Sequence, residues 1–201
     1  MTQTNQDTDL AQIRMSQILE ATIGLVAERG GDNVRLREIS GATGLSIGTL
    51  QHYFTTRDNL LKSAFLKHHE RVIASISSAG DKSLEPWQRV RKMLDLLTQD
   101  ASLLTRSKLW VEMASQASRD EQIREAAHHV YERWRNVFDE TIREGIKRGQ
   151  FDPPLPVEHT TSAILAAVDG YEIALTFQVE DAALIKVRIE PLISLLLGRG
   201  V

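Results

Sequence analysis

Apolar residues recur every three to four positions over almost the whole chain. This spacing places them along one face of an α-helix, and no segment alternates apolar and polar residues over the length of a strand. The stripe of the first segment consists of Met15, Ile18, Leu19, Thr22, Leu25 and Val26. The glycines that follow Arg29 are typical of a helix end. The pattern therefore predicts an all-α protein whose first helix runs from about Leu10 to Arg29.

Eight further helices follow from the same pattern, which gives about nine in all. A short helix is expected at Leu36–Thr43, and a second one lies within "GLSIGTLQHYFTTRDNL", from Gly44 to Leu60. Thr55 or Thr56 can cap a long helix that continues to about Ser78. Pro191 lies within the last segment and is expected to kink it. The remaining five helices are expected at about Trp87–Asp100, Leu103–Ser118, Asp120–Lys147, Val157–Gln178 and Asp181–Gly198.

The two short helices, joined by a turn with a glycine and preceded by a longer helix, are typical of a helix-turn-helix. The second helix of that motif enters the major groove of DNA. Gly48 would let this helix approach the bases closely, while Thr49 and Gln51 can hydrogen-bond to base edges. A solvated connector between helices is the alternative interpretation. The inner side would carry Leu45, Leu50 and Phe54, and the outer side and its borders Ile47, Gly48, Thr49, Gln51, His52 and Tyr53.

The segment "VRLREISGATGLSIGTLQHYFTTRDNLL" resembles the DNA-binding signature of the TetR family of bacterial transcriptional regulators. In that family a short recognition helix ends in tyrosine or histidine followed by phenylalanine. The resemblance covers about Ile13 to Ala74, and "RGQFDPPLP" with "ILAAVDGYEIA" is more weakly similar to the carboxyl-terminal half of the BetI-like branch. The resemblance implies a DNA-binding domain at residues 8–56 and a helical ligand-binding and dimerisation domain at residues 57–201.

The family resemblance and the helix faces together predict the DNA contacts. Ile47 could touch a thymine methyl group or pack inward, and His52 could reach a phosphate, a base or only water. Tyr53 is expected to pack its ring inward with its hydroxyl toward a phosphate, and Arg57 replaces the more usual lysine that pairs with phosphate. The predicted DNA-binding residues are Arg35, Ser46, Ile47, Gly48, Thr49, Gln51, His52, Tyr53 and Arg57.

The net charge of the chain does not indicate a nucleic-acid partner. Its net charge is -3, and residues 1–57 contain five Arg and Lys residues against six Asp and Glu residues. Specific contacts and helix N-termini would therefore have to supply the affinity that bulk charge does not, and we expect modest non-specific binding. This acidic balance and Ile47 are the support for an alternative function, a small-ligand-binding or adaptor protein of the same fold that has lost DNA binding.

The helices beyond the first sixty residues are expected to bind an unknown small-molecule effector and to form a homodimer. Core packing is the commoner role for each aromatic residue or methionine there, and burial within the monomer is the alternative for the apolar stripes. The predicted ligand-binding residues are Trp87, Met93, Trp110, Met113, Trp134, Phe138 and Tyr171. The predicted dimer interface consists of Ile164, Ala167, Val168, Tyr171, Ala174, Leu175, Leu184, Val187, Leu192, Leu195 and Leu196.

Catalysis, metal binding and cofactors are not expected. The chain has no cysteine, no phosphate-binding loop and no nucleophile elbow, and the Glu-x-x-His spacing of Glu125 and His128 occurs without a second copy. The polar N-terminus is unlike a signal peptide, and no apolar run approaches the roughly 20 residues that span a bilayer. We therefore predict a cytoplasmic protein without a membrane partner. The resemblance to the TetR family implies a repressor that binds palindromic double-stranded operator DNA as a homodimer and is released by its effector.

Overall fold

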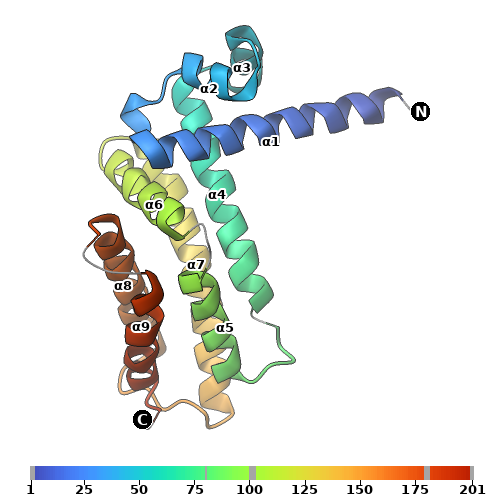
Figure 1. Ribbon diagram of the computed structural model, residues 1–201. Helices are drawn as coiled ribbons and strands as arrows, with labels where there is room; N and C mark the ends of the chain where they lie inside the picture. The colour runs from blue at the N-terminus through green and yellow to red at the C-terminus, as the bar shows by residue number, and fades with distance from the viewer. Residues whose placement is uncertain (1–2, 80, 100–102, 179–181, 200–201) are drawn as a thin grey trace.

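The computed structural model describes residues 3–79, 81–99, 103–178 and 182–199. Within these ranges the chain forms α-helices and one 3-10 turn and no strand, which confirms the predicted all-α class (Figure 1). The elements are α1 (Gln3–Arg29), η1 (Gly31–Asn33), α2 (Leu36–Thr43), α3 (Ile47–Phe54), α4 (Arg57–Ala79), α5 (Pro86–Gln99), α6 (Leu103–Ala117), α7 (Glu121–Lys147), α8 (Val157–Thr176) and α9 (Ala182–Leu196).

Most helix ends lie within two residues of those expected, and the exceptions have simple causes. Helix α1 begins at Gln3 rather than near Leu10, because the polar segment before Leu10 contains neither Gly nor Pro to stop a helix. Pro191 lies inside α9 as expected. The expected ends at Asp100 and Asp181 lie outside the described residues.

Local capping explains where the short helices begin and end. Gly44 ends α2 in the left-handed conformation at φ 70°, and its N–H donates to Ser40 O at 2.9 Å. Thr56, not Thr55, caps α4, because Thr56 Oγ1 accepts the Asn59 N–H at 3.1 Å. Thr55 instead ends α3 with a φ of 55°, which is an uncommon conformation for a β-branched residue.

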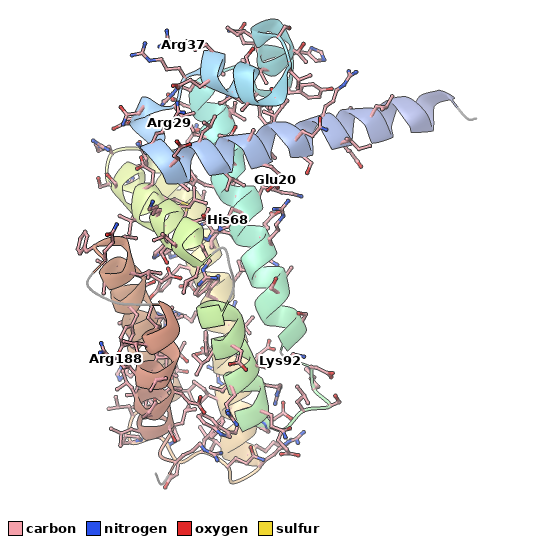
Figure 2. The ribbon with its side chains drawn as sticks, in the orientation of Figure 1. Glu20, Arg29, Arg37, His68, Lys92 and Arg188 are labelled. Atoms are coloured by element: carbon pink, nitrogen blue, oxygen red, sulfur yellow. The ribbon has the colours of Figure 1, made fainter. Side chains whose placement is uncertain are left out.

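The helices form an elongated molecule with α2 and α3 at one end and the carboxyl terminus at the other (Figure 1). Helix α1 crosses the first part of α4 and projects beyond it, while α8 and α9 lie side by side on the opposite flank. Arg71 of α4 pairs with Glu20 of α1 where the two helices cross (Figure 2). The crossing therefore ties the projecting helix to the long α4.

Two main hydrophobic cores fill the molecule, and α4 contributes to both. The predicted division between residues 56 and 57 cuts through the first of them, since Leu60, Leu61 and Phe65 of α4 belong to it. The first core also contains Ile18, Leu19, Ile23, Val26, Val34, Ile39, Leu50, Phe54, Ala64, Leu109, Met113 and Ile123. The second core contains Ile73, Val90, Met93, Leu94, Val130, Trp134, Phe138, Ile142, Phe151, Ile164, Leu165, Val168, Ile189, Ile193 and Leu197.

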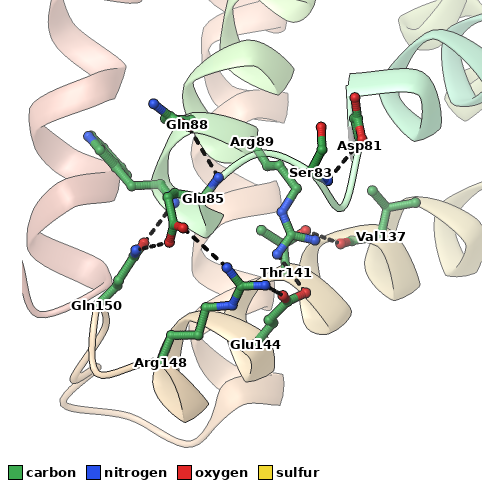
Figure 3. A network of polar contacts seen from close by, with 11 residues as sticks. Asp81, Ser83, Glu85, Gln88, Arg89, Val137, Thr141, Glu144, Arg148 and Gln150 are labelled. Atoms are coloured by element: carbon green, nitrogen blue, oxygen red, sulfur yellow. Dashed lines mark hydrogen bonds and ion pairs between the residues drawn. The ribbon is translucent and has the colours of Figure 1, made fainter.

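A network of charged side chains closes the end of the molecule farthest from α3 (Figure 3). Arg89 Nη2 of α5 lies 2.6 Å from Glu144 Oε2 of α7, and Arg148 bridges Glu144 to Glu85, with its Nη1 3.3 Å from Glu85 Oε1. Gln150 joins the network by donating to Glu85. These contacts fix the start of α5 against the end of α7.

Candidate nucleic-acid interface and buried cavity

Helix α3 presents one side to the first core and the other to solvent. Leu50 and Phe54 are buried, whereas Gln51 and His52 are exposed. At the helix start, Ser46 Oγ accepts the Thr49 N–H at 3.1 Å and lies 2.8 Å from Thr49 Oγ1. The hydroxyl groups of Ser46 and Thr49 are thus engaged with each other, and Gln51 offers an exposed amide for base recognition.

The middle of the exposed side is open to close approach. A Cβ atom added at Gly48 would meet nothing nearer than Ser46 Oγ at 3.8 Å, so the space above Gly48 is available. Ile47 is 42% exposed, so its side chain does not pack into the first core. An exposed isoleucine next to an open glycine suits contact with a thymine methyl group.

Tyr53 and Arg57 form the border between α3 and α4. The Tyr53 ring is partly buried against the first core, and its centroid lies 6.4 Å from that of Phe54. The Arg57 side chain is partly exposed, and all three of its guanidinium nitrogens have partners within the chain. Its Nε donates to Val34 O at 2.6 Å, its Nη2 donates to Gly31 O, and its Nη1 lies 3.0 Å from Asp58 Oδ1. Arg57 therefore holds the η1 loop against α4, a role that differs from the expected phosphate contact.

Arg35 lies at the start of α2, and its side chain is exposed. Its backbone N–H donates to Glu38 Oε2 at 2.7 Å, and Arg29 Nη1 donates to Glu38 Oε1 at 2.9 Å. The hydrogen bond from the Arg35 backbone, aided by Arg29, lowers the pKa of Glu38. Glu38 thus stays ionised and fixes the loop from which Arg35 projects.

A small, largely enclosed cavity lies between α4, α6, α7 and α8, with room for about one water molecule at most. Aromatic rings form much of its wall. The rings of Trp110 and Tyr131 are stacked at 6.4 Å between centroids with 9° between planes, and the His69 ring meets Trp110 edge to face at 5.2 Å. The lining residues are His69, Arg106, Trp110, Val130, Tyr131, Trp134, Asp169 and Glu172.

Charged groups share this wall with the rings. Arg106 Nε donates to Glu172 Oε1 at 3.1 Å, and Trp110 Nε1 donates to Asp169 Oδ1 at 3.1 Å. Burial and the neighbouring Glu172 carboxylate raise the pKa of Asp169 to about 6. Burial, with smaller contributions from His68 and Arg106, lowers the pKa of His69 to about 3. Burial also raises the pKa of Glu172, and the guanidinium of Arg106 opposes this effect. The wall therefore brings together two carboxyl groups, one guanidinium and a neutral imidazole.

Comparison with known proteins assigns both regions to one family. Residues 18–64 match the family model described as "Bacterial regulatory proteins, tetR family", and residues 86–188 match "BetI-type transcriptional repressor, C-terminal". The chain belongs to the TetR family of transcriptional regulators. The expected resemblance is confirmed over both halves of the chain.

Individual relatives of this TetR-family regulator span most of its length. It is 27% identical over 159 residues to the regulator PksA of Bacillus subtilis, covering 78% of this chain and 76% of PksA. It is 24% identical over 164 residues to BetI of Burkholderia thailandensis, covering 80% of each. A Saccharomonospora viridis regulator solved with choline shares the fold at a TM-score of 0.84 and 21% identity, over 92% of this chain and 96% of that one.

Of the seven predicted ligand-binding residues of this TetR-family regulator, only Trp110 and Trp134 line the cavity. Met93 and Phe138 are buried in the second core and Met113 in the first, because the apolar helix faces that suggested a pocket are filled by neighbouring helices. Arg199 Cζ lies 4.4 Å from the centroid of the Trp87 ring, and Tyr171 packs against the second core. These five residues are core or surface contacts rather than cavity lining.

Sequence reasoning missed most of the cavity wall. The missed residues are His69, Arg106, Val130, Tyr131, Asp169 and Glu172. A signal was present in Asp169 and Glu172, two carboxylates within the otherwise apolar run "ILAAVDGYEIAL". Carboxylates on an apolar helix face are rarely fully buried without a partner or a function.

The predicted dimer stripe divides into buried and exposed parts. Ile164, Val168 and Leu175 are buried within the single chain and cannot contact a partner, which corrects the prediction for these three. Ala167, Tyr171, Ala174 and Leu196 are partly buried. Large exposed side chains remain on α8 and α9, of which the first two were not predicted: Ile173, Phe177, Leu184, Val187, Leu192 and Leu195.

The geometry gives little support for metal binding or for a membrane-spanning helix. Glu125 and His128 are exposed on α7. Among the residues that the structure describes, no three His, Asp or Glu side chains are grouped to hold a metal ion. None of the described helices is long and apolar enough to cross a membrane.

Proposed function

We propose that this TetR-family regulator is a repressor that binds a palindromic operator as a homodimer and leaves it when an effector fills the cavity. Several relatives are named as repressors, among them KstR of Mycobacterium tuberculosis, 25% identical over 127 residues. The exposed face of α3 supplies the base-reading surface, with Gln51 at its centre. Contacts to the phosphate backbone of DNA orient this surface, and they come from Tyr53, Arg35 and the start of α4.

One observation carries the coupling between the cavity and the DNA-reading end, namely that α6 contacts both. Arg106 and Trp110 of α6 line the cavity. Farther along the same helix, Gln116 Nε2 donates to Asp32 Oδ1 at 3.1 Å, and Glu112 packs on Gly31 so closely that an added Cβ would lie 2.7 Å from its Oε1. A displacement of α6 at the cavity therefore also displaces the η1 loop.

The same loop is held to the first turn of α4 by Arg57. The cavity has room for no more than about one water molecule. A larger ligand must therefore separate its walls, and only the conformation with separated walls binds it. The two α3 helices of a dimer must lie about 34 to 36 Å apart to enter successive major grooves of the operator. A ligand that favours a different position of α6 therefore weakens operator binding, and the operator weakens ligand binding by the same factor.

The exposed apolar faces of α8 and α9 support the homodimer, with a second copy of the chain as the occupant. Leu195 is 62% exposed and Val187 68% exposed on α9. Helix α9 lies beside α8 on the flank away from α4 (Figure 1). Leu195→Glu should fold, since the side chain is exposed in the monomer, but should dissociate the dimer by burying an unpaired charge. Light scattering measures this, and Leu155→Glu, at a 45% exposed position in the loop before α8, is the matched control. An unmutated protein that is monomeric at micromolar concentration contradicts the proposal.

Operator binding and release are tested together. Fluorescence anisotropy with DNA from upstream of the protein's own gene should show specific binding, and metabolites that raise the melting temperature should weaken it. Choline and stearoyl-CoA, the ligands in two solved structures with the same fold, are two chemically different first candidates. A ligand that binds tightly without changing operator affinity contradicts the sensor. Absence of specific binding to any genomic fragment would favour the alternative, a protein of this fold that has lost DNA binding.

A further inference from the structure

A second and larger pocket lies where the helix-turn-helix meets the rest of the chain. Its volume is about 210 Å³, against about 10 Å³ for the cavity between α4, α6, α7 and α8. The η1 loop, the first part of α4, the end of α6 and the start of α7 enclose it, with Asp32, Asp58, Gln116 and Ile123 as one lining residue from each segment. We call it the junction pocket, and it shares no residue with the effector cavity.

Apolar side chains form the inner part of the junction pocket. Leu61 and Phe65 of α4 and Ile123 of α7 line it, and all three are buried members of the first core. The aspartates that line the same pocket are exposed, so they lie toward its entrance. Binding sites for small molecules typically combine an apolar lining with a few placed polar groups. The inner part therefore suits a short hydrocarbon chain.

Hydrogen bonds hold the walls of the pocket in place. Arg57 Nε donates to Val34 O at 2.6 Å and its Nη2 donates to Gly31 O, which fixes the η1 loop to α4. Gln116 Nε2 donates to Asp32 Oδ1 at 3.1 Å, which fixes the same loop to α6. A pocket that is already formed spares its ligand the cost of ordering the chain.

Two carboxylates of the pocket lack a positively charged partner. Asp58 Oδ1 lies 3.0 Å from Arg57 Nη1, so Asp58 is paired. Asp32 accepts a hydrogen bond from the neutral amide of Gln116, and Asp120 accepts one from the Ile123 backbone N–H at 3.0 Å. Each of these two bonds uses Oδ1 and leaves Oδ2 available. The uncompensated carboxylates therefore belong to two different segments, the η1 loop and the residue that caps α7.

A single metal ion does not fit this arrangement. Within the part of the chain that the structure describes, no three His, Asp or Glu side chains are close enough together to hold one. Two separate carboxylates above an apolar surface instead fit a ligand with a positive group at each end and hydrocarbon between them. A primary ammonium group has three N–H donors, and its hydrogen bonds to carboxylates are stronger than those between neutral groups.

We propose that the junction pocket binds a linear aliphatic diamine, a dication with two primary ammonium groups joined by methylene groups. One ammonium group binds Asp32 and the other binds Asp120. The methylene groups lie over Leu61, Phe65 and Ile123. The ligand thereby joins the η1 loop, at the DNA-reading end, to the start of α7. This site is additional to the proposed effector cavity and does not depend on it.

A set of probes separates the two charges from the hydrocarbon chain. The probes are the diamines from 1,3-diaminopropane to 1,6-diaminohexane, the monoamine 1-aminobutane, the uncharged 1,4-butanediol, and Mg²⁺ as a dication without methylene groups. Isothermal titration calorimetry of the full chain at low ionic strength gives each affinity. The best diamine should bind once per chain and at least about tenfold more tightly than the other three probes.

Two further measurements follow from the same arrangement. Affinity within the diamine series should be highest at one chain length, because the two carboxylates are held at fixed positions. Binding should weaken as sodium chloride is added, since both ion pairs lie near the surface. The best diamine should also raise the melting temperature, because it binds the folded chain.

Variants assign the two charges to residues. Asp32→Asn and Asp120→Asn should each lower the affinity of the best diamine about tenfold and leave that of 1,4-butanediol unchanged. Asparagine is as good a helix cap as aspartate, so Asp120→Asn should keep the start of α7. The matched control is Asp81→Asn, because Asp81 is exposed in the loop before α5 and also accepts a backbone N–H, from Ser83 at 2.9 Å. It should not change the affinity.

Several outcomes would overturn the inference. These are no binding by any diamine at millimolar concentration, equal affinity for a diamine and 1-aminobutane, affinity that is independent of chain length, and Mg²⁺ binding as tight as that of the best diamine. Diamine binding that Asp32→Asn and Asp120→Asn change no more than Asp81→Asn also overturns it, because the charges then lie elsewhere. None of these results affects the proposed function, which fails only in the operator and effector experiments described for it.

Discussion

The recognition helix and the cavity both depend on polar side chains, but the two regions treat these groups in opposite ways. On α3, Gln51 and His52 are exposed to water. In the cavity, Asp169 and Glu172 come from the same helix, α8, and burial raises the pKa of both carboxyl groups. A surface polar group costs little in the free protein, whereas a buried charge costs several kcal/mol unless it is paired. The cavity is therefore where binding chemistry and stability conflict.

The largest effect is expected for the buried ion pair. Arg106→Met removes the guanidinium beside Glu172 and should lower the free energy of unfolding by about 3 to 5 kcal/mol. Urea denaturation measures this. The control is Arg143→Met, because Arg143 is 53% exposed where it pairs with Glu158 at 3.0 Å and should contribute less than about 1 kcal/mol. Equal losses in the two variants would remove the energetic contrast between cavity and surface.

The next largest effect is a pH dependence that only the cavity should show. Because the pKa of Asp169 is about 6 in the folded protein against 3.8 ordinarily, the folded state holds a proton that the unfolded state has lost between these pH values. The Asp169 contribution to stability is therefore fully present below pH 4 and is lost as pH rises through 6. Asp169→Asn should escape this loss, which amounts to about 2 to 3 kcal/mol. A difference in unfolding free energy between the two proteins that stays constant from pH 4 to 7 would contradict it.

A substitution on the exposed face of the recognition helix should change the affinity for DNA and leave the free energy of unfolding unchanged. Gln51→Ala is expected to cost about 1 to 3 kcal/mol per half-site on the preferred operator and to relax preference at one base pair. Binding isotherms at several salt concentrations should show an unchanged slope, because no phosphate contact is lost. A changed salt slope with intact sequence preference would show that Gln51 contacts the backbone instead.

The smallest effect concerns Arg57, which lies on the border of the DNA-reading surface but acts within the fold. Arg57→Ala removes the hydrogen bonds to Val34 O and Gly31 O and should lower the free energy of unfolding by about 1 to 2 kcal/mol. The slope of log affinity against log salt should stay the same. If the slope instead flattens by about one unit per half-site, Arg57 leaves its loop to bind phosphate in the complex.

The sequence by itself determined the local features of this protein. Helix periodicity and caps placed most helix ends, since Gly44, Thr56 and Asp120 act on their immediate neighbours. It also determined the exposed face of α3, because an eight-residue helix with Leu50 and Phe54 on one side has a single outward arc. Trp110 and Trp134 were predicted as ligand contacts and do line the cavity.

Tertiary structure decided the rest, because the deciding contacts join residues far apart in the chain. Periodicity marks a residue as inward-facing but does not distinguish a cavity wall from a core. Phe138 and Trp134 share α7 and both are buried, yet only Trp134 meets Asp169 and His69 around an unfilled space. The sequence predicted Arg57 as a phosphate ligand, and only the fold shows that its guanidinium binds Gly31 O and Val34 O in the free chain. Ile164 and Leu195 carried the same apolar signal, and only the packing of α8 and α9 made one core and the other surface.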